Sequence, residues 1–482
     1  MNLLRKKTSS IIILLLAIIF LGCENITVSD SDNADSALLE TSRALELKSI
    51  ISSGASTEIP ESEMLNVLSD SLGNEFTVSI SESDKVEFSE NSVSRNAMSE
   101  SESKVYVCDI VNNKTGETGF AVTSNDRRLG PVLAILPNAE FGDNELSAML
   151  IDAVENYIEY TDFVMGELSK TDFSRSLSPS AQAATGSYKF KNFVCNKKNE
   201  SNLLYTNWTQ EYPYNSVVNS EIGDGNSYPV GCGAIALGQI FTRIKPFKTC
   251  SLANYSNVIY DWDKMSALNS ISCKKNVSDI WGGSRETRTM IQALLREIGV
   301  GCNAKYGEQT SISMNDMRAY LDKIGVSYIY GKYDLNCITN SIDSNKLVCI
   351  LSQSICTETR YRKYFKLFGS KIKNSNWSNY SYSGGHYFVI DAYSNYTYDL
   401  YDSSNAYVQT CNADFVHVNI GWANLNKSGY YLSGLFNTNN TPLSDAKSSR
   451  KAGWHTDKTS EETYGEKGYY QYNNLMLYNL YK

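Results

Sequence analysis

The chain has 482 residues and a formal net charge of −9, from 44 Lys and Arg against 53 Asp and Glu. This acidic balance, without a long basic block, argues against a nucleic-acid partner, which would need a positive patch to bind phosphates. The chain is also longer than a typical single domain, so we expect several folding units.

The N-terminus is predicted to be a targeting segment. Basic residues 5–7 precede an apolar run, 11–21, that is too short to span a bilayer. The run ends in Gly22-Cys23, a small residue directly before a cysteine, as at a bacterial lipoprotein cleavage site. We therefore expect residues 1–23 to be a lipoprotein-type signal peptide and Cys23 to carry the lipid that anchors the chain to a membrane. An ordinary signal peptide cut nearby is the alternative, and both readings imply export to the cell surface, the outer membrane or, after processing, the medium.

The next segments separate a polar stretch from a folded one. Residues 24–103 are rich in Ser, Asp, Glu and Asn, which predicts a disordered tether. Order is expected to begin near Lys104, where short strand-like runs alternate with turns. A helix is expected over about 144–165, because apolar residues recur on one face. Residues 104–168 would thus form a small α+β unit.

A polar linker of small residues follows over 169–188. Exposed linkers of this kind are where proteases cut. A small domain, a cleavable linker and then a domain with a nucleophile is the layout of a zymogen.

The last predicted domain, 189–482, has its helices first and its strands second. Helices are expected over 232–243, 284–298 and 313–324. After about residue 346 the pattern changes to strands. This order favours an α+β fold with one helical and one antiparallel lobe and a cleft between them.

Cys232 is the candidate nucleophile. It lies between Gly231 and Gly233 at the start of an apolar helix, where the positive end of the helix dipole favours a thiolate. The flanking glycines leave room for a substrate backbone, and the backbone N–H of Cys232 can face an oxyanion. The alternative is a buried structural cysteine, which the histidine motif further along the chain makes less attractive.

His386 is the candidate base, because it follows Gly385 at the predicted start of a strand. His417 is its rival, since it lies two residues before Asn419 and on the same strand face. Asn419 would accept a hydrogen bond from one ring N–H and leave the other nitrogen for the sulfur. Asp391 is a carboxylate alternative, but its offset of five points it away from His386, and a solvated or turn-bonding Asp is expected.

At these positions the chain resembles the streptopain family of papain-like cysteine peptidases. The matching segments are Trp208-x-Gln210-x-x-Pro213-Tyr214-Asn215, Gly231-Cys232 with Ala236 and Gln239-Ile240, Gly385-His386-x-Phe388-Val389-Ile390-Asp391, and His417-Val418-Asn419-x-Gly421-Trp422. The unit at about 104–165 resembles the inhibitory propeptide of that family.

The resemblance implies a papain-like two-lobed fold and a role for each matched residue. Cys232 would be the nucleophile, His386 the base and Asn419 the residue that orients it. Gln210, which residues alone would leave as a surface glutamine, would be the oxyanion donor. Gly231, Gly233, Gly385 and Trp422 would line the substrate cleft.

The resemblance also implies partners and a precursor form. The chain would cleave extracellular protein or peptide substrates, with its own propeptide as inhibitor, and would be processed near 170–190. It would need no cofactor, and the cysteines show no CxxC pairs that would suggest a zinc site.

Two departures from the family pattern motivate the first of two alternatives. Gly233 stands where the family has an apolar residue, and Ile420 replaces the indole that would shield the His–Asn bond. One alternative is a surface-anchored, inactive papain-like binding lipoprotein. The other is a Cys/His amidase or acyltransferase that acts on cell-wall peptides. The basic, Tyr-rich segment 357–383 is predicted to be a flap or a solvated loop, and residues past about 440 an added edge strand.

Overall fold

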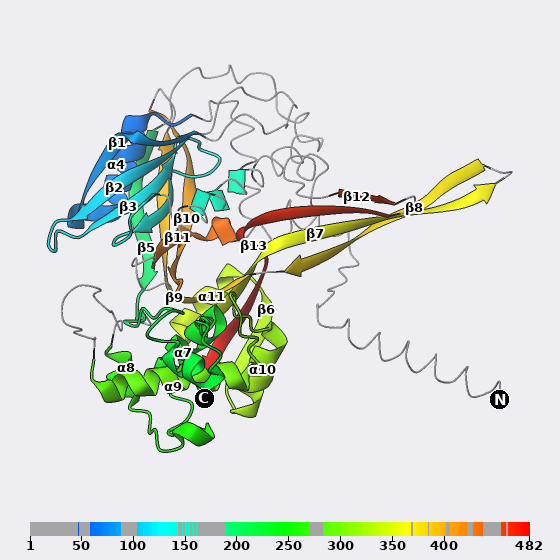
Figure 1. Cartoon of the computed structure of the whole chain (residues 1–482). Helices are drawn as coiled ribbons and strands as arrows, with labels where there is room; N and C mark the ends of the chain where they lie inside the picture. The colour runs from blue at the N-terminus through cyan, green and yellow to red at the C-terminus, as the bar shows by residue number, and fades with distance from the viewer. Residues whose placement is uncertain are drawn as a thin grey trace.

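The computed structural model is a mixed α+β structure, as predicted (Figure 1). The structure describes residues 58–87, 104–142, 189–201, 203–268, 283–367, 370–383, 385–401, 405–421, 428–436, 455–458 and 461–482, with Leu47 and scattered positions between 147 and 161.

The N-terminal unit is a helix packed on an antiparallel sheet. Its elements are α4 (Glu61–Leu72), η1 (Gly73–Glu75), β1 (Phe76–Glu87), β2 (Lys104–Asn112), β3 (Thr118–Ser124) and β4 (Val132–Leu136). Helix α4 buries Met64, Val67 and Leu68, which its 3.6-residue period places on one face. Order therefore begins earlier than the predicted start at Lys104, and part of the predicted tether 24–103 is folded. The polar composition of residues 24–103 as a whole predicted disorder, because it outweighs this short apolar stripe.

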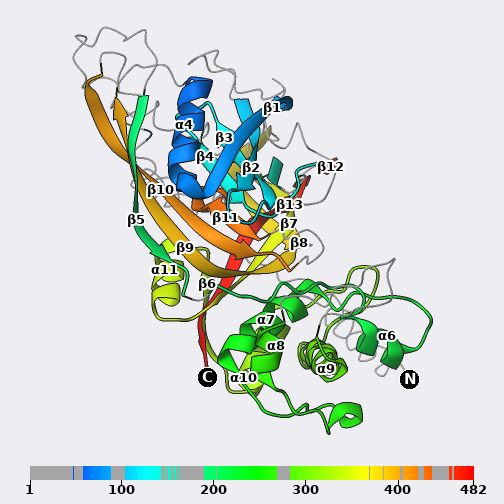
Figure 2. The ribbon, with the colours of Figure 1, turned by 90° about the vertical axis from the view of Figure 1, so that its left-hand side faces the viewer.

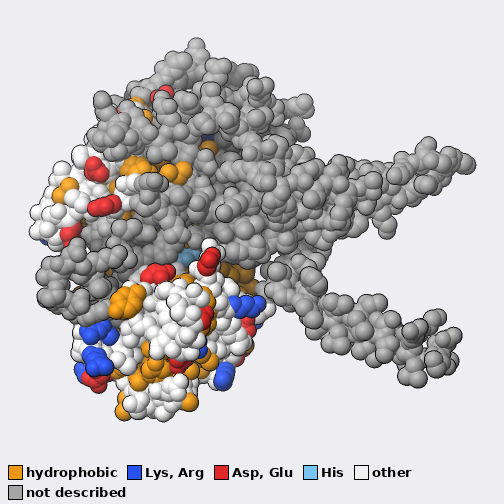
Figure 3. All heavy atoms as spheres, viewed as in Figure 1, with side chains coloured by type: hydrophobic (Ala, Val, Ile, Leu, Met, Phe, Trp, Pro, Cys, Tyr) orange, Lys and Arg blue, Asp and Glu red, His pale blue; other side chains and the backbone are white. Residues whose placement is uncertain are grey.

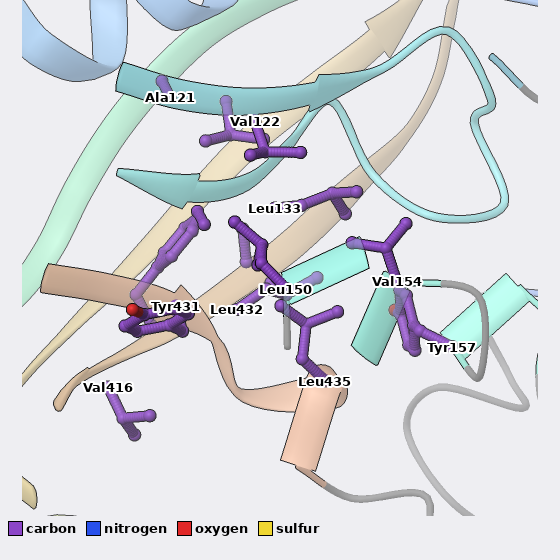
Figure 4. Packing of buried hydrophobic residues seen from close by; sticks show 14 of the residues in the cluster. Ala121, Val122, Leu133, Leu150, Val154, Tyr157, Val416, Tyr431, Leu432 and Leu435 are labelled. Carbon is purple, nitrogen blue, oxygen red and sulfur yellow. The ribbon is translucent and has the colours of Figure 1, made fainter. Parts of the chain in front are cut away.

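The N-terminal unit and the second lobe share one sheet. Strand β4 pairs antiparallel with β11 (Gly429–Leu432), which sets Ile135 opposite Tyr430 and Ala134 opposite Tyr431. The sheet order is β1-β2-β3-β4-β11-β10-β9-β7-β13-β12. Figure 4 shows the apolar side chains that pack across this junction. They include Ala121, Val122 and Leu133 from the strands, Leu150, Val154 and Tyr157 from helical positions, and Tyr431, Leu432 and Leu435 beyond them.

The helical lobe has a core of its own around α7. The elements are α6 (Ser216–Ile222), α7 (Cys232–Ile244), η3 (Ala253–Tyr255), α8 (Trp262–Ser266), α9 (Arg285–Gly301) and α10 (Met314–Lys323). The three predicted helices correspond to α7, α9 and α10. Ser313 caps the start of α10, because its hydroxyl accepts the Asp316 N–H at 3.0 Å.

The second lobe is antiparallel and surrounds a long central strand. Its elements are β5 (Lys189–Asn199), β6 (Ser327–Lys332), α11 (Leu335–Asp343), β7 (Val348–Leu367), β8 (Ser370–Ser383), β9 (His386–Tyr401), β10 (Tyr407–Asn419), η5 (Ser433–Phe436), β12 (His455–Lys458) and β13 (Glu461–Tyr481). Strand β9 pairs with β10 on one side and with β7 and then β5 on the other. Figure 2 shows β9 and β10 as long curved strands that end near α7.

Two C-terminal features differ in part from the sequence-based expectations. The segment past residue 440 contributes the expected edge strand, β12, which pairs with β13, and also an inner strand, β13 itself, which pairs with both β7 and β6. The predicted flap at 357–383 is part of the β7–β8 hairpin, which projects from the body of the molecule (Figure 1).

On the visible face of the helical lobe, Lys and Arg side chains alternate with Asp and Glu side chains, and apolar groups lie between them (Figure 3). In the described residues, no helix has both the length and the apolar character needed to cross a bilayer. The predicted signal peptide and Cys23 lie outside the described residues.

Candidate active site

Cys232 is the first residue of α7, and its sulfur lies against the start of β9. The preceding Gly231 has φ of +94°, a conformation that glycine adopts without strain. Burial raises the pKa of the Cys232 thiol, and hydrogen bonds from the backbone N–H groups of Tyr387 and Gly233 oppose this rise. The predicted base, His386, is therefore the residue directly before the one whose N–H contacts the sulfur.

His386 opens β9 opposite Ser352 of β7, and only 3% of its surface is exposed. Its Nε2 lies 2.7 Å from the backbone oxygen of Ile420. A carbonyl can only accept, so Nε2 carries the hydrogen and donates it, which leaves Nδ1 as the basic nitrogen of the neutral ring. The ring is therefore held in the tautomer that a general base requires.

Asn419 lies next to this carbonyl, but its side chain makes other contacts. Its Oδ1 accepts from Gln239 Nε2 at 3.2 Å and from the Gly421 N–H at 3.2 Å, while Nδ2 donates to the Thr206 oxygen at 2.8 Å. The described geometry thus has the Ile420 carbonyl as the partner of the ring, and the Asn419 amide braces the loop that carries this carbonyl. The orienting role assigned to Asn419 stays a prediction.

Gln210 is brought to the nucleophile by its backbone. Its carbonyl accepts the Val230 N–H at 2.9 Å, two residues before Cys232. The side chain is half-buried at this position. An amide donor beside the N-terminus of α7 is what a developing oxyanion would need, and this role remains a prediction.

The two departures from the family pattern have physical explanations. A Cβ at Gly233 would lie 3.1–3.3 Å from side-chain carbons of Met317, Tyr387 and Ile312, so these side chains fill the space of the missing apolar residue. Ile420 serves His386 through a backbone carbonyl, which any residue supplies. Its own side chain is buried in the core of the second lobe.

The rival histidine belongs to a separate pair. His417 Nδ1 and Asp391 Oδ1 are 2.5 Å apart, and the other Asp391 oxygen accepts the Leu204 N–H at 2.8 Å. Asp391 is fully buried, so the expectation of a solvated or turn-bonding Asp was wrong. The Tyr430 ring packs edge-on against His417 with centroids 5.0 Å apart.

The remaining predicted site residues are only partly described. Gly385, half-buried, precedes His386, whereas Trp422 lies outside the described residues. In the part of the chain that the structure describes, no three His, Cys, Asp or Glu residues gather as ligands for a metal. The sequence reasoning missed the Ile420 carbonyl, because a backbone group leaves no residue signal. Gln239 lies in one of the segments that match the family pattern, but its residue type alone indicates no role.

Comparisons with known proteins point to one family. Residues 208–431 match the peptidase C10 family. No curated protein matches the chain.

Two solved structures from Prevotella intermedia are similar. A mutant fragment of prointerpain A is 17% identical, with a TM-score of 0.38, and the match covers 78% of this chain and 96% of that one. The active wild-type interpain A cysteine protease is 18% identical, with a TM-score of 0.31, over 60% of this chain and 97% of that one. Both likenesses are distant, so the family assignment depends on the match at 208–431.

Proposed function

Through residues 208–431 the chain belongs to the peptidase C10, or streptopain, family of cysteine proteases, and on this premise we propose that it is an exported endopeptidase made as an inactive precursor. The observation that carries the proposal is the meeting of Cys232 with the start of β9. The Tyr387 N–H contacts the sulfur, and the neighbouring His386 ring is held by Ile420. His386, 154 positions after Cys232 in the sequence, thus directly precedes the residue whose N–H contacts the sulfur.

In the acylation step, His386 Nδ1 takes the thiol proton and Cys232 Sγ attacks the scissile carbonyl. The resulting oxyanion is stabilised by the Cys232 N–H and the Gln210 amide. When the tetrahedral intermediate collapses, the C–N bond breaks and the imidazolium gives its proton to the leaving amine. The products of this step are a thioester and a free amine.

In the deacylation step, a water molecule loses its proton to His386 and attacks the thioester carbonyl. The C–S bond breaks, the acid product leaves, and the proton returns to the sulfur. Through both steps the Ile420 carbonyl accepts from Nε2–H, so the ring can change its charge without turning. The family and these groups require no metal or organic cofactor for either step.

The precursor part of the proposal is supported by the sheet that the N-terminal unit and the second lobe share. The unit predicted to be the propeptide pairs with β11, and its apolar side chains are continuous with those of the second lobe. Burial also raises the pKa of the Cys232 thiol. A higher thiol pKa lowers the thiolate fraction, which is the direction expected of a latent enzyme.

Export and anchoring are proposed from the N-terminal sequence. Cys23 after Gly22 supports a lipid anchor, with extracellular proteins as substrates. Detergent partitioning of the whole protein against its Cys23→Ser variant tests this. Loss of membrane association in the variant is expected, and unchanged association would exclude an anchor at Cys23.

The central experiment follows residues 24–482 and their Cys232→Ser variant by gel and intact mass. We expect the wild type to lose the region before about residue 190 and to hydrolyse casein, while the variant stays whole and inert. Two inert, full-length proteins, even after an active homologous protease is added, would favour an inactive binding protein. Cleavage of cell-wall peptides without cleavage of casein would favour the amidase or acyltransferase reading.

A further inference from the structure

Gln239 is a fully buried amide on the helix that begins with Cys232. Its Oε1 accepts the backbone N–H of Trp208 at 3.2 Å, and its Nε2 donates to Asn419 Oδ1 at 3.2 Å. Seven residues separate Gln239 from Cys232, which is two helical turns. The two side chains therefore lie on the same face of α7, about 10 Å apart along its axis.

The first contact holds the segment that leads to Gln210. Trp208 is two residues before Gln210, and its side chain is fully buried. A Cβ at Gly238 would lie 3.2 Å from the Trp208 ring, so the ring packs directly on the backbone of α7. Trp208 is thus held to this helix twice, by its N–H and by its indole.

The second contact holds the loop that orients His386. Asn419 precedes Ile420, whose carbonyl accepts from His386 Nε2. Gly421 on the other side lies against α7 as well, since a Cβ there would be 2.8 Å from Ile235 Cγ2. The Gln239 amide therefore contacts both the segment that leads to Gln210 and the loop that carries the Ile420 carbonyl.

We propose that Gln239 is the positioning residue that sets Gln210 and the Ile420 carbonyl in register with Cys232. A buried amide of this length offers an acceptor oxygen and a donor nitrogen at fixed spacing, and both atoms are used here. Few side chains of similar shape could serve both loops. This proposal rests on the proposed peptidase function, and it adds a residue that acts through Trp208 and Asn419 without contact to the substrate.

The test compares the full chain with three variants on α7. Gln239→Met keeps the volume but removes both hydrogen bonds. Gln239→Glu keeps both only while its carboxyl is protonated, because the ionised form has no donor for Asn419. Thr242→Val is the matched control, since Thr242 is buried on the same helix and its hydroxyl donates only to the Gln239 carbonyl, at 2.6 Å.

Four quantities are measured on each protein: the melting temperature, kcat for casein after processing, KM for casein after processing, and the rate of Cys232 alkylation by iodoacetamide against pH. Alkylation is followed by mass on the Cys232 peptide, because other free cysteines react too. Cys232→Ser supplies the blank. The alkylation profile reports how His386 and Cys232 share a proton, and it needs no turnover.

We expect Gln239→Met to lower kcat by about 10²-fold with KM nearly unchanged, since a shift of about 1 Å in a catalytic group can cost this much. Its alkylation profile should shift along the pH axis. Gln239→Glu should approach wild type at low pH and fall behind as pH rises, and burial widens the range in which it is protonated. Thr242→Val should have a lower melting temperature, while its kcat and the pH profile of its Cys232 alkylation stay as in the wild type.

The proposal is overturned if either Gln239 variant, folded at the assay temperature, keeps the wild-type kcat and alkylation profile at all pH values. It is equally overturned if Thr242→Val changes both as much as Gln239→Met does. If Gln239→Met does not fold, the near-isosteric Gln239→Glu decides through its pH dependence. A wild type that cannot hydrolyse casein would sink the peptidase function, and the alkylation profiles would still report whether Gln239 positions the pair.

Discussion

Gly429→Val is expected to release the N-terminal unit from the second lobe. Gly429 is the first residue of β11, directly beside β4. A Cβ at this position would lie 2.6 Å from the backbone oxygen of Ile135 and 3.0–3.1 Å from two carbons of Leu136. The nearest atom belongs to the backbone and cannot turn away as a side chain would, so β4 has to move.

The magnitude follows from two costs. Forcing a side chain into a packed site costs about 1–3 kcal/mol. Loss of the short pairing of Tyr430 with Ile135 and Tyr431 with Ala134 adds about 0.5–1.5 kcal/mol for each hydrogen bond. A total of about 2–4 kcal/mol weakens an association by roughly 30- to 1,000-fold.

The assay uses the Cys232→Ser chain, cut at the 169–188 linker by an added protease. The two pieces are passed over a sizing column at falling concentrations. With Gly429→Val, they should separate at a concentration about two orders of magnitude higher than without it. Gly331→Val is the matched control, because a Cβ there meets only Tyr478, at 3.7 Å. If Gly429→Val and Gly331→Val pieces stay together equally well, the β4–β11 pairing does not hold the unit.

Two further predictions concern the histidines and one ion pair. His386→Ala should reduce casein hydrolysis by roughly 10²- to 10⁴-fold. His417→Ala should keep the wild-type hydrolysis and lower the free energy of unfolding by about 2–3 kcal/mol, because buried Asp391 loses its histidine partner. The opposite pattern in activity and melting temperature would exchange the roles of the two histidines. Burial favours a raised pKa at Asp343, yet hydrogen bonds from Lys197, Asn199 and Tyr393 lower it below its ordinary 3.8. The stability that these hydrogen bonds give the folded protein is fully present above pH 3.8, and it is lost as the pH falls through the lower pKa that Asp343 has in the folded state. Asp343→Asn should therefore melt at a lower temperature than wild type at pH 7. The difference should vanish toward pH 2, and a difference that persists there would contradict the linkage.

The sequence predicted the helices around the nucleophile because their signals are local. The start of α7 follows from a glycine before an apolar periodic run, and that of α10 from the Ser313 cap. The pairing of β4 with β11 could not be predicted in this way, since it joins residues about 300 positions apart. No turn or periodicity records which distant strand a given strand will meet.

In the candidate site, too, features with a local sequence signal could be predicted and features without one could not. Residue types predicted Cys232 as nucleophile and His386 as base, and the structure brings the sulfur to the N–H of the residue after His386. The partner of the His386 ring is a backbone oxygen, which every residue carries and no motif can single out. The burial of Asp391 was missed for a related reason: His417, on the neighbouring strand, reaches it only through the β9–β10 register.

Strand β9 explains why the base depends on both lobes at once. Its first side chains alternate between the two cores, as the two-residue period of a strand requires. Phe388 and Ile390 pack in the core that includes the N-terminal unit, while Tyr387 and Val389 pack in the core of the helical lobe. The start of β9, and with it His386, is therefore fixed by two sets of apolar contacts that share no side chain. A change in either core can therefore move His386 relative to Cys232, which belongs to the helical lobe. Polar contacts, such as the hydrogen bonds of Gln239 to Trp208 and Asn419, then fix the positions of the two residues relative to each other.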